Sequence, residues 1–234
     1  MCKIAISNSY QSDEKFQNYK DWLHLVDQKL ELEKISFDDK NLDLEKYNGF
    51  VLTGGSDVDP NLYKSENHFK IYGINKKRDE FELKIIETAF KNKIPLIGIC
   101  RGLQVANVYF KGTLWEDLEI IGNKNNHKSI NDIQDRSHEI NISENTLLHQ
   151  IVKNKKVNVN SSHHQGARII GDELIESAIS DDGVIEALEL KDKTKNPFML
   201  FVQWHPEREI NKEISSIPIA KAFIIKAKEN CINI

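Results

Sequence analysis

The 234-residue sequence contains few cysteines, few prolines and no long apolar run. Three widely spaced cysteines, an odd number, argue against a disulfide framework and favour a reducing compartment. The longest apolar runs fall far short of a membrane span, and Met1–Ile6 is too short for a secretion signal. We therefore expect a cytoplasmic protein that does not bind a membrane.

The sequence also lacks an excess of charge of either sign. It has 32 Lys and Arg against 36 Asp and Glu, a formal net charge of -4, and these charges are interspersed. Such a distribution gives no electrostatic reason to expect nucleic acid as a partner. No internal repeat or Pro-rich linker interrupts the chain, and its length suffices for a sizeable core. We expect a single domain over residues 1–234.

In the first hundred residues, short apolar runs alternate with segments of helical periodicity. This alternation predicts an α/β fold with a three-layer, mostly parallel, doubly wound sheet. In such sheets, binding sites form beyond the carboxyl ends of the strands. The expected elements are strands at 4–6, 32–35, 50–52 and 94–97, and helices at 14–30 and 80–90.

The second half of the chain has a different pattern. Apolar runs at 139–142, 157–159, 174–180 and 184–190 predict antiparallel additions to the sheet, and a further strand is expected at 198–202. A closing helix should span 214–229, with Pro218 in its first turn or kinking it. Residues 120–134 are rich in Asn, Lys and Gly, which predicts a mobile loop or lid. Its His127 is expected to be exposed rather than a ligand.

The most informative motif is GICRG at 98–102, between an apolar strand and a helical segment. Glycines two residues before and after Cys100 allow a strained turn with close packing of neighbouring chain segments. The sulfur of Cys100 would then lie at a helix N-terminus, where the N–H groups and the dipole favour an anion. Alternatively, Cys100 is a small buried apolar residue, which is the common role of a lone cysteine.

A partner base occurs near the C-terminus, where an apolar strand leads into QWHPE at 203–207. Histidine can take the thiol proton and return it to a leaving amine, so His205 is the candidate base. Glu207 could fix the tautomer of that histidine, and Pro206 stiffens the turn between them. Alternatively, His205 merely ends a strand and Glu207 is a solvated charge.

These residues carry a family resemblance. The chain resembles class I glutamine amidotransferase-like hydrolases, and most closely the γ-glutamyl-γ-aminobutyrate hydrolase group, which is peptidase C26-like. The resemblance implies a flavodoxin-like sheet. Lys111 departs from the family pattern, which typically has glycine there, and residues 7–47 match poorly. The matching motifs, in the order of the family, are LTGGSDVDP (52–60), RDEFE (78–82), PLIGICRGLQ (95–104), GTLWEDL (112–118), NSSHHQG (160–166), DGVIEA (182–187) and VQWHPE (202–207).

The resemblance also implies the chemistry. A catalytic triad of Cys100, His205 and Glu207 would cleave a γ-glutamyl amide through a glutamyl thioester, with no cofactor and no metal. Residues 161–164 show no zinc-ligand spacing and no nearby acidic partner. Asp57 and Asp59 are expected to shape their loop through Asx turns, and the Arg101 side chain is either a substrate clamp or part of an ion pair. The backbone amides of Gly55 and Arg101 would form the oxyanion hole, and the substrate-binding residues would be Gly54, Gln104, Ser162, His163 and His164.

Several functional hypotheses remain open at the sequence level. The first is a free-standing hydrolase of a small γ-glutamyl conjugate, for which γ-aminobutyrate is the family's default leaving amine. The second is the glutaminase subunit of a two-component amidotransferase that passes ammonia to a synthase partner. The third is an inactive binding or regulatory relative, which the complete triad disfavours. The same acyl chemistry would also fit another leaving group, such as a nucleotide-linked phosphoramidate. A homodimer is compatible with each hypothesis.

Overall fold

The computed structural model describes residues 2–8, 13–65, 70–122, 125–130, 134–210 and 214–232. Within these ranges, nine strands form one sheet in the order β2-β1-β3-β4-β11-β10-β9-β6-β7. A small second sheet pairs β5 (Thr113–Trp115) with β8 (Gly166–Ile169). The strands of the main sheet are β1 (Lys3–Ser7), β2 (Glu31–Ile35), β3 (Gly49–Leu52), β4 (Leu96–Ile99), β6 (Arg136–Ile142), β7 (Lys156–Ser161), β9 (Leu174–Ser180), β10 (Ile185–Leu190) and β11 (Met199–Val202).

The main sheet has a parallel half and an antiparallel half. Strands β2, β1, β3, β4 and β11 pair in parallel, whereas β11–β10, β10–β9, β9–β6 and β6–β7 pair antiparallel. The prediction of a parallel sheet with antiparallel additions from the second half of the chain is therefore confirmed. The carboxyl ends of β3, β4 and β11 lie side by side. The GG motif lies just beyond β3, GICRG spans the end of β4 and the start of α3, and QWHPE follows β11.

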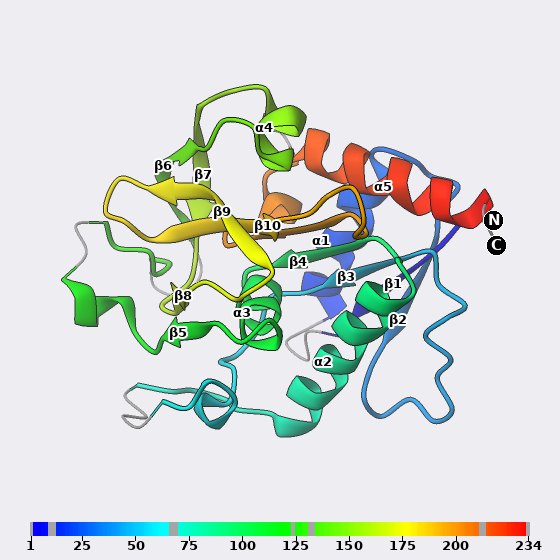
Figure 1. Cartoon of the computed structure of the whole chain (residues 1–234), viewed down its shortest axis with the longest axis horizontal. Helices are drawn as coiled ribbons and strands as arrows, with labels where there is room; N and C mark the ends of the chain where they lie inside the picture. Colours follow the sequence, from blue (N-terminus) through cyan, green and yellow to red (C-terminus); the bar gives the residue numbers. More distant parts are fainter. Residues whose placement is uncertain are drawn as a thin grey trace.

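Helices cover both faces of the sheet, which gives the three layers that the alternation of strands and helices predicts (Figure 1). Helices α1, α4 and α5 cover one face, and α2 and α3 cover the other. Side chains of a strand alternate between the two faces, so Ile4 and Ile6 join one core cluster while Ala5 joins the other. The helices are α1 (Asp13–His24), α2 (Lys76–Lys91), α3 (Arg101–Tyr109), α4 (Leu147–Val152) and α5 (Ile217–Ile232).

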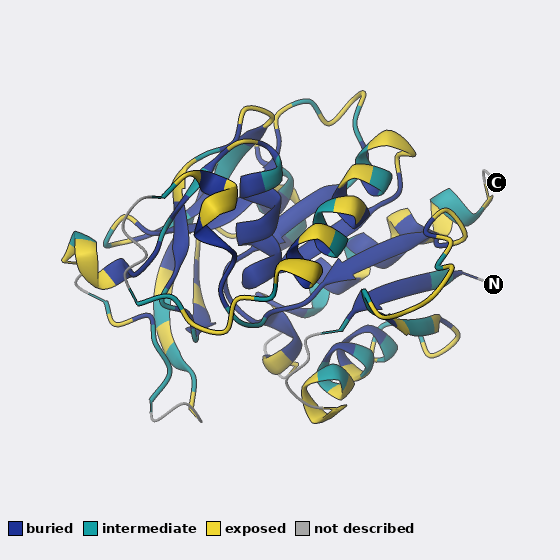
Figure 2. Ribbon diagram, turned by 90° about the horizontal axis from the view of Figure 1, so that it is seen from below, coloured by how far each residue is buried: buried dark blue, intermediate teal, exposed yellow. Residues whose placement is uncertain are grey.

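The core strands are buried on both faces, and the exposed residues concentrate on the outward surfaces of helices and on loops (Figure 2). All four residues of β3, β4 and β11 are buried, as expected for parallel strands covered on both sides by helices. Pro218 lies in the first turn of α5 as predicted, at a position where its missing N–H has no intrahelical partner to lose.

Two local features differ from the sequence pattern. The helix predicted at 14–30 ends at His24, because the chain turns where the Asp27 carboxylate accepts from the Lys29 N–H (2.9 Å). Lys111 has a φ of 70°, in the left-handed region that glycine adopts most readily, which explains why glycine suits this position.

Among the helices within the described ranges, none combines the length and apolarity that crossing a bilayer requires.

Candidate active site

Cys100 occupies the strained turn that its flanking glycines predict. It lies between β4 and α3 with a φ of 53° and a ψ of -101°, a conformation that L-residues rarely adopt. The turn depends on close packing, because a Cβ on Gly98 would come within 2.8 Å of the backbone of Gly102. A Cβ on Gly102 would in turn come within 2.7 Å of the Leu52 carbonyl oxygen on β3. Both glycines are therefore required for the turn that presents the sulfur.

His205 and Glu207 follow β11, the strand that pairs in parallel with β4. Pro206 begins a short 3-10 helix, η3 (Pro206–Arg208), and thereby brings the two side chains together. Nδ1 of His205 lies 2.7 Å from Oε1 of Glu207, and both side chains are buried. Because Nδ1 is committed to the carboxylate, Nε2 is the nitrogen left for the sulfur of Cys100.

Asn160 holds the backbone of His205 in place. Its side-chain oxygen accepts from the His205 N–H (2.7 Å), and its Nδ2 donates to the His205 carbonyl oxygen (2.9 Å). Sequence reasoning assigned no role to this asparagine, which lies 45 positions away in the chain. Its place in the NSSHHQG motif was the available signal, since an asparagine amide can satisfy a backbone donor and acceptor together.

The electrostatics of the pair favour an imidazolium beside a carboxylate. Burial alone would lower the pKa of His205, but the Glu207 carboxylate and the Cys100 sulfur together raise it to about 9. Burial would likewise raise the pKa of Glu207, but the neighbouring His205 ring holds that pKa below its ordinary value. At neutral pH, His205 therefore carries the proton that a leaving amine requires.

The Gly54–Gly55 loop lies against the side chains of His205 and Cys100. A Cβ on Gly54 would come within 2.9 Å of Cε1 of His205 and 3.7 Å of the Cys100 Cβ. The Gly54 N–H already donates to the Tyr19 hydroxyl (2.9 Å), a contact that sequence reasoning missed. Gly55 adopts a φ of 156°, and a Cβ there would overlap the Arg78 guanidinium.

Buried ion pairs and hydrogen bonds from two arginines hold this loop and the first turn of α3 in place. Arg78 donates from Nη2 to the Gly54 carbonyl (2.9 Å) and from Nε to Glu82 (2.9 Å). Arg101 donates from Nε to the Ser56 carbonyl (2.9 Å), and its guanidinium forms ion pairs with Asp79 and Glu82. The Arg101 side chain thus takes the ion-pair alternative rather than the substrate clamp.

Gln104 lies one turn after Cys100, at the centre of a buried polar chain. Its Nε2 donates to the Gln165 carbonyl (3.2 Å) and lies 3.4 Å from Oε1 of Gln203. Nε2 of Gln203 lies 3.5 Å from the Cys100 sulfur. Gln203 precedes His205 on the strand-end motif and was not singled out from the sequence.

Ser162, His163 and His164 line a cavity of about 540 Å³ together with Lys15 and Tyr72. The expectation that residues 161–164 have no acidic partner is wrong. Nε2 of His164 lies 2.8 Å from Asp57, and Nε2 of His163 lies 3.6 Å from Glu186. Both acids are distant in sequence, so residue spacing could not reveal them.

Asp57 also departs from the expected Asx turn. Its carboxylate accepts from the Tyr72 N–H (2.7 Å) and contacts His164, so it joins two separate segments. Asp59 does form the predicted turn, because its side chain accepts from the Asn61 N–H (3.0 Å) and caps the short 3-10 helix η1 (Pro60–Tyr63).

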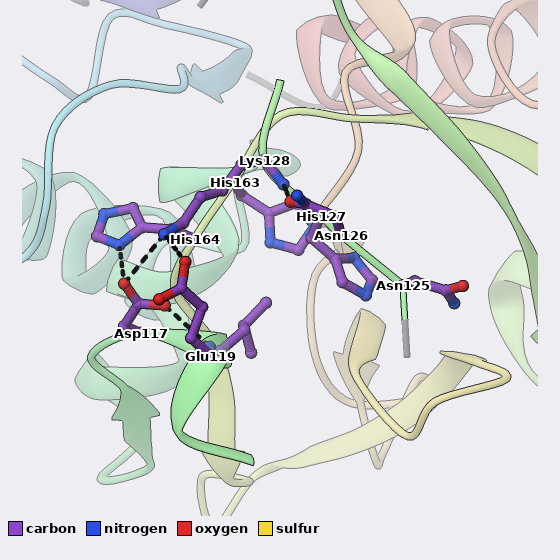
Figure 3. Close-up of a pocket in the computed structure, with 9 residues that line it drawn as sticks. Asp117, Glu119, Asn125, Asn126, His127, Lys128, His163 and His164 are labelled. Atoms are coloured by element: carbon purple, nitrogen blue, oxygen red, sulfur yellow. Dashed lines mark hydrogen bonds and ion pairs between the residues drawn. The ribbon is translucent and has the colours of Figure 1, made fainter. Parts of the chain in front are cut away.

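The prediction that His127 is exposed is wrong, since only 2% of its surface is accessible. Its Nε2 lies 3.2 Å from Asp182, and the segment around it lines a cavity of about 200 Å³ (Figure 3). The described part of the segment is thus partly packed against the fold, and residues 123–124 and 131–133 of the predicted lid lie outside the described residues. Asp117, His164 and Lys128 converge on the opposite side of the same cavity.

The fold and the strand-end site together define a class I glutamine amidotransferase-like domain. A model of the Peptidase C26 family matches residues 36–207, and the chain belongs to that family.

Individual proteins agree with this assignment. The chain is 36% identical over 183 residues to a Schizosaccharomyces pombe protein named as a glutamine amidotransferase, PB2B2.05, with 77% of this chain and 70% of that protein covered. It is 33% identical over 188 residues to the gamma-glutamyl-gamma-aminobutyrate hydrolase PuuD of Escherichia coli K12, with coverages of 77% and 72%.

A solved structure shares the fold. The glutaminase domain of the Trypanosoma brucei protein CTPS superimposes with a TM-score of 0.65 at 17% identity, covering 98% of this chain and 94% of that one. Taken with the sequence matches, the chain is a glutamine amidotransferase-like hydrolase of C–N bonds.

Proposed function

We propose that this protein hydrolyses the γ-glutamyl amide bond of a small γ-glutamyl conjugate, releasing glutamate and an amine. Cys100 is the nucleophile, His205 the acid and base, and Glu207 the group that orients and charges His205. The observation that carries the proposal is the joint geometry of Cys100 at a positive-φ turn and the 2.7 Å contact between His205 and Glu207. These two features come from neighbouring parallel strands, which fixes their relative position.

In the first half-reaction, the Cys100 sulfur attacks the γ-carbonyl carbon, and negative charge develops on the carbonyl oxygen. The amides of Gly55 and Arg101 stabilise that oxygen, and removing one such donor typically costs about 3 kcal/mol of transition-state stabilisation. The choice of Gly55 over Gly54 is supported by the Gly54 N–H, which already donates to Tyr19. His205 then gives its proton to the nitrogen as the C–N bond breaks, leaving a glutamyl thioester.

In the second half-reaction, neutral His205 takes a proton from water as the water oxygen attacks the thioester carbon. The C–S bond breaks, glutamate leaves, and the sulfur and imidazolium are restored. The amine leaves with the proton of His205 and water replaces it, so one water is consumed per cycle and no atom changes oxidation state. By the family resemblance, Gln104 and residues 162–164 would hold the glutamyl group. Gln104 belongs to the polar chain that reaches the sulfur, and residues 162–164 line the cavity of about 540 Å³.

The leaving amine should carry an acidic group. Burial and the nearby Arg208 guanidinium lower the pKa of Lys15, which lines the cavity of about 540 Å³. Asp135 pairs with Arg208 (2.8 Å) and partly offsets this effect on Lys15, and an anion on the leaving amine would favour the charged form of Lys15 further. The carboxylate of γ-aminobutyrate supplies one, and so would a phosphoryl group.

Turnover of a panel of γ-glutamyl amides by the purified chain tests this proposal. We expect glutamate release from γ-glutamyl-γ-aminobutyrate, and much slower ammonia release from glutamine. Strong glutaminase activity that appears only after a synthase partner is added would instead support the two-component amidotransferase. No turnover of any conjugate, with Cys100 accessible to alkylation, would contradict the hydrolase assignment.

A further inference from the structure

We propose that His127, His138 and Glu186, with His163 beside them, form a binding site for a divalent transition-metal ion of the zinc class. These four residues, called here the histidine cluster, do not depend on the proposed reaction, although one of them, His163, also lines the cavity of about 540 Å³ that is proposed for the substrate. They come from four separate segments: the 125–130 segment, β6, β10 and the turn after β7.

The ring nitrogens of the histidine cluster converge on one carboxylate oxygen. Oε1 of Glu186 lies 3.3 Å from Nδ1 of His127, 3.0 Å from Nε2 of His138 and 3.6 Å from Nε2 of His163. One ligand atom from each of His127, His138 and Glu186 lies within 4.8 Å of the others. The rings of His127 and His163, whose centroids lie 4.9 Å apart, both line the smaller cavity (Figure 3). Metal–ligand bonds of about 2 Å require separations of this order.

The outer nitrogens of two of the rings are already committed elsewhere. Nδ1 of His163 lies 2.9 Å from the Gln165 carbonyl, to which it can only donate. Nε2 of His127 lies 3.2 Å from the Asp182 carboxylate, which is likewise an acceptor. Histidines that bind metals characteristically donate their other N–H to a carboxylate or a backbone carbonyl, which directs the opposite lone pair at the ion. Both rings have that arrangement.

Two buried atoms of the cluster lack a hydrogen-bond partner in the part of the chain that the structure describes. Nε2 of His163 and Oε2 of Glu186 are buried, and neither makes a hydrogen bond there. The side chains of His163 and Glu186 are 2% and 0% exposed, so bulk solvent does not reach them. Buried polar atoms of this kind are costly unless something coordinates them. A cation bound at the Glu186 carboxylate would coordinate Nε2 of His163 and lower the cost of burying the carboxylate charge.

The donor set indicates which ion fits. Three imidazole nitrogens and one carboxylate oxygen suit zinc and its neighbours, whereas magnesium and calcium prefer oxygen ligands. Four protein ligands leave no open position, so the site would stabilise structure rather than perform chemistry. Its link to the active site is the Gln165 carbonyl, which Nδ1 of His163 and Nε2 of Gln104 both contact.

The test is metal binding by the full-length chain after chelator treatment. Zn²⁺ and Co²⁺ are titrated into the parent and into Cys100→Ala. This variant removes the cysteine of the active site, which could bind these ions in place of the histidine cluster. We expect one equivalent per chain in both, with the intense visible absorption of four-coordinate cobalt. At a free zinc concentration about 1,000 times Kd, Tm should rise by roughly 8 °C.

Variants locate the ion. His138→Gln should weaken zinc binding at least 100-fold, and Asp182→Asn should weaken it by about 10–100-fold through the His127 orientation. His149→Gln, on α4, is the matched control and should bind like the parent. Circular dichroism of each metal-free variant verifies that it folds. If His138→Gln does not fold, Glu186→Gln provides a second variant of the cluster.

Three outcomes would overturn the proposal. They are no stoichiometric binding, binding that Cys100→Ala abolishes, and binding that both His138→Gln and Glu186→Gln retain. The first would mean that the cluster shares protons rather than a metal, and the second would place the ion at the catalytic cysteine.

Discussion

The molecule contains two buried groupings of histidine and carboxylate that differ in how they are assembled. In the catalytic grouping, one carboxylate faces one histidine, and the opposite side of that ring faces a sulfur. In the histidine cluster, one carboxylate faces three histidines. The first arrangement holds a proton that can be passed on. The second concentrates lone pairs, which suits a cation.

Burial alone therefore does not define the role of a histidine. His205 and His163 are both buried, yet the pKa of His205 is raised to about 9 whereas burial lowers the pKa of His163. The difference lies in the neighbours: Glu207 contacts the ring of His205 and the Arg208 guanidinium (3.7 Å), whereas His163 shares Glu186 with two other rings. The predictions below test this contrast, beginning with the largest expected effect.

Removing the nucleophile should separate the two groupings most clearly. We expect Cys100→Ala to lower kcat/KM by about 10⁴-fold or more, whereas His138→Gln should stay within about tenfold of the parent. Steady-state release of glutamate measures both. Activity of Cys100→Ala within tenfold of the parent would eliminate the covalent mechanism.

Alkylation offers an independent check. Burial and the nearby Cys231 thiol raise the pKa of Cys2 to about 11, so Cys2 should react slowly with iodoacetamide. Cys100, at a helix N-terminus beside His205, should be labelled first. Peptide mapping after brief exposure measures the order, and equal labelling of Cys2 and Cys100 would contradict it.

Neutralising the orienting carboxylate should have the next largest effect. Glu207→Gln should lower kcat by about 10²–10⁴-fold with little change in KM, because Glu207 contacts His205 and not the glutamyl group. The alkaline limb of kcat/KM, near pH 9 in the parent, should move to lower pH as the pKa of His205 falls. Full kcat in Glu207→Gln would reduce the triad to a Cys–His pair.

The two groupings also differ in how far the sequence could predict them. The strands, the Cys100 turn and the His205–Glu207 pair were predictable because each depends on residues close together in the chain. The histidine cluster and the Asn160 contacts were not, since they join residues far apart in the chain: Asn160 and His205 are 45 positions apart, and His127 and Glu186 are 59 positions apart. His127 was expected to be exposed because its neighbours are polar. No residue near it in the sequence indicated that Asp182 and Glu186 contact it in the fold.

Stability should depend on pH through the catalytic grouping. The folded pKa of His205 is about 9 against an ordinary value of 6.5, so its contribution is fully present below about pH 6.5 and is lost as pH rises through 9. The loss should be about 3 kcal/mol in the free energy of unfolding, measured with urea at about pH 6 and pH 10. Glu207→Gln should show a clearly smaller loss, and an equal loss would mean that other groups cause it.

Removing the cation near the leaving group should have the smallest effect. Lys15→Gln should raise KM for γ-glutamyl-γ-aminobutyrate by about fivefold, since a partly exposed charge contributes modestly. KM for a γ-glutamyl amide of an uncharged amine should not change. Lys20→Gln, on the same helix, is the matched control. An equal rise in KM for the two substrates would argue against an acidic leaving group.

The Asn160 contact has one more consequence, which concerns local unfolding. In a flat sheet β7 would lie four strand spacings, roughly 19 Å, from β11, yet Asn160 near the end of β7 bonds the backbone beyond β11. The antiparallel half must therefore curl back toward the centre, so that an edge strand holds the backbone of His205, the proposed catalytic histidine. Edge elements generally open at lower free energy than the core. Warming or mild denaturant should accordingly release this contact first, and the protein should lose activity before its parallel core melts.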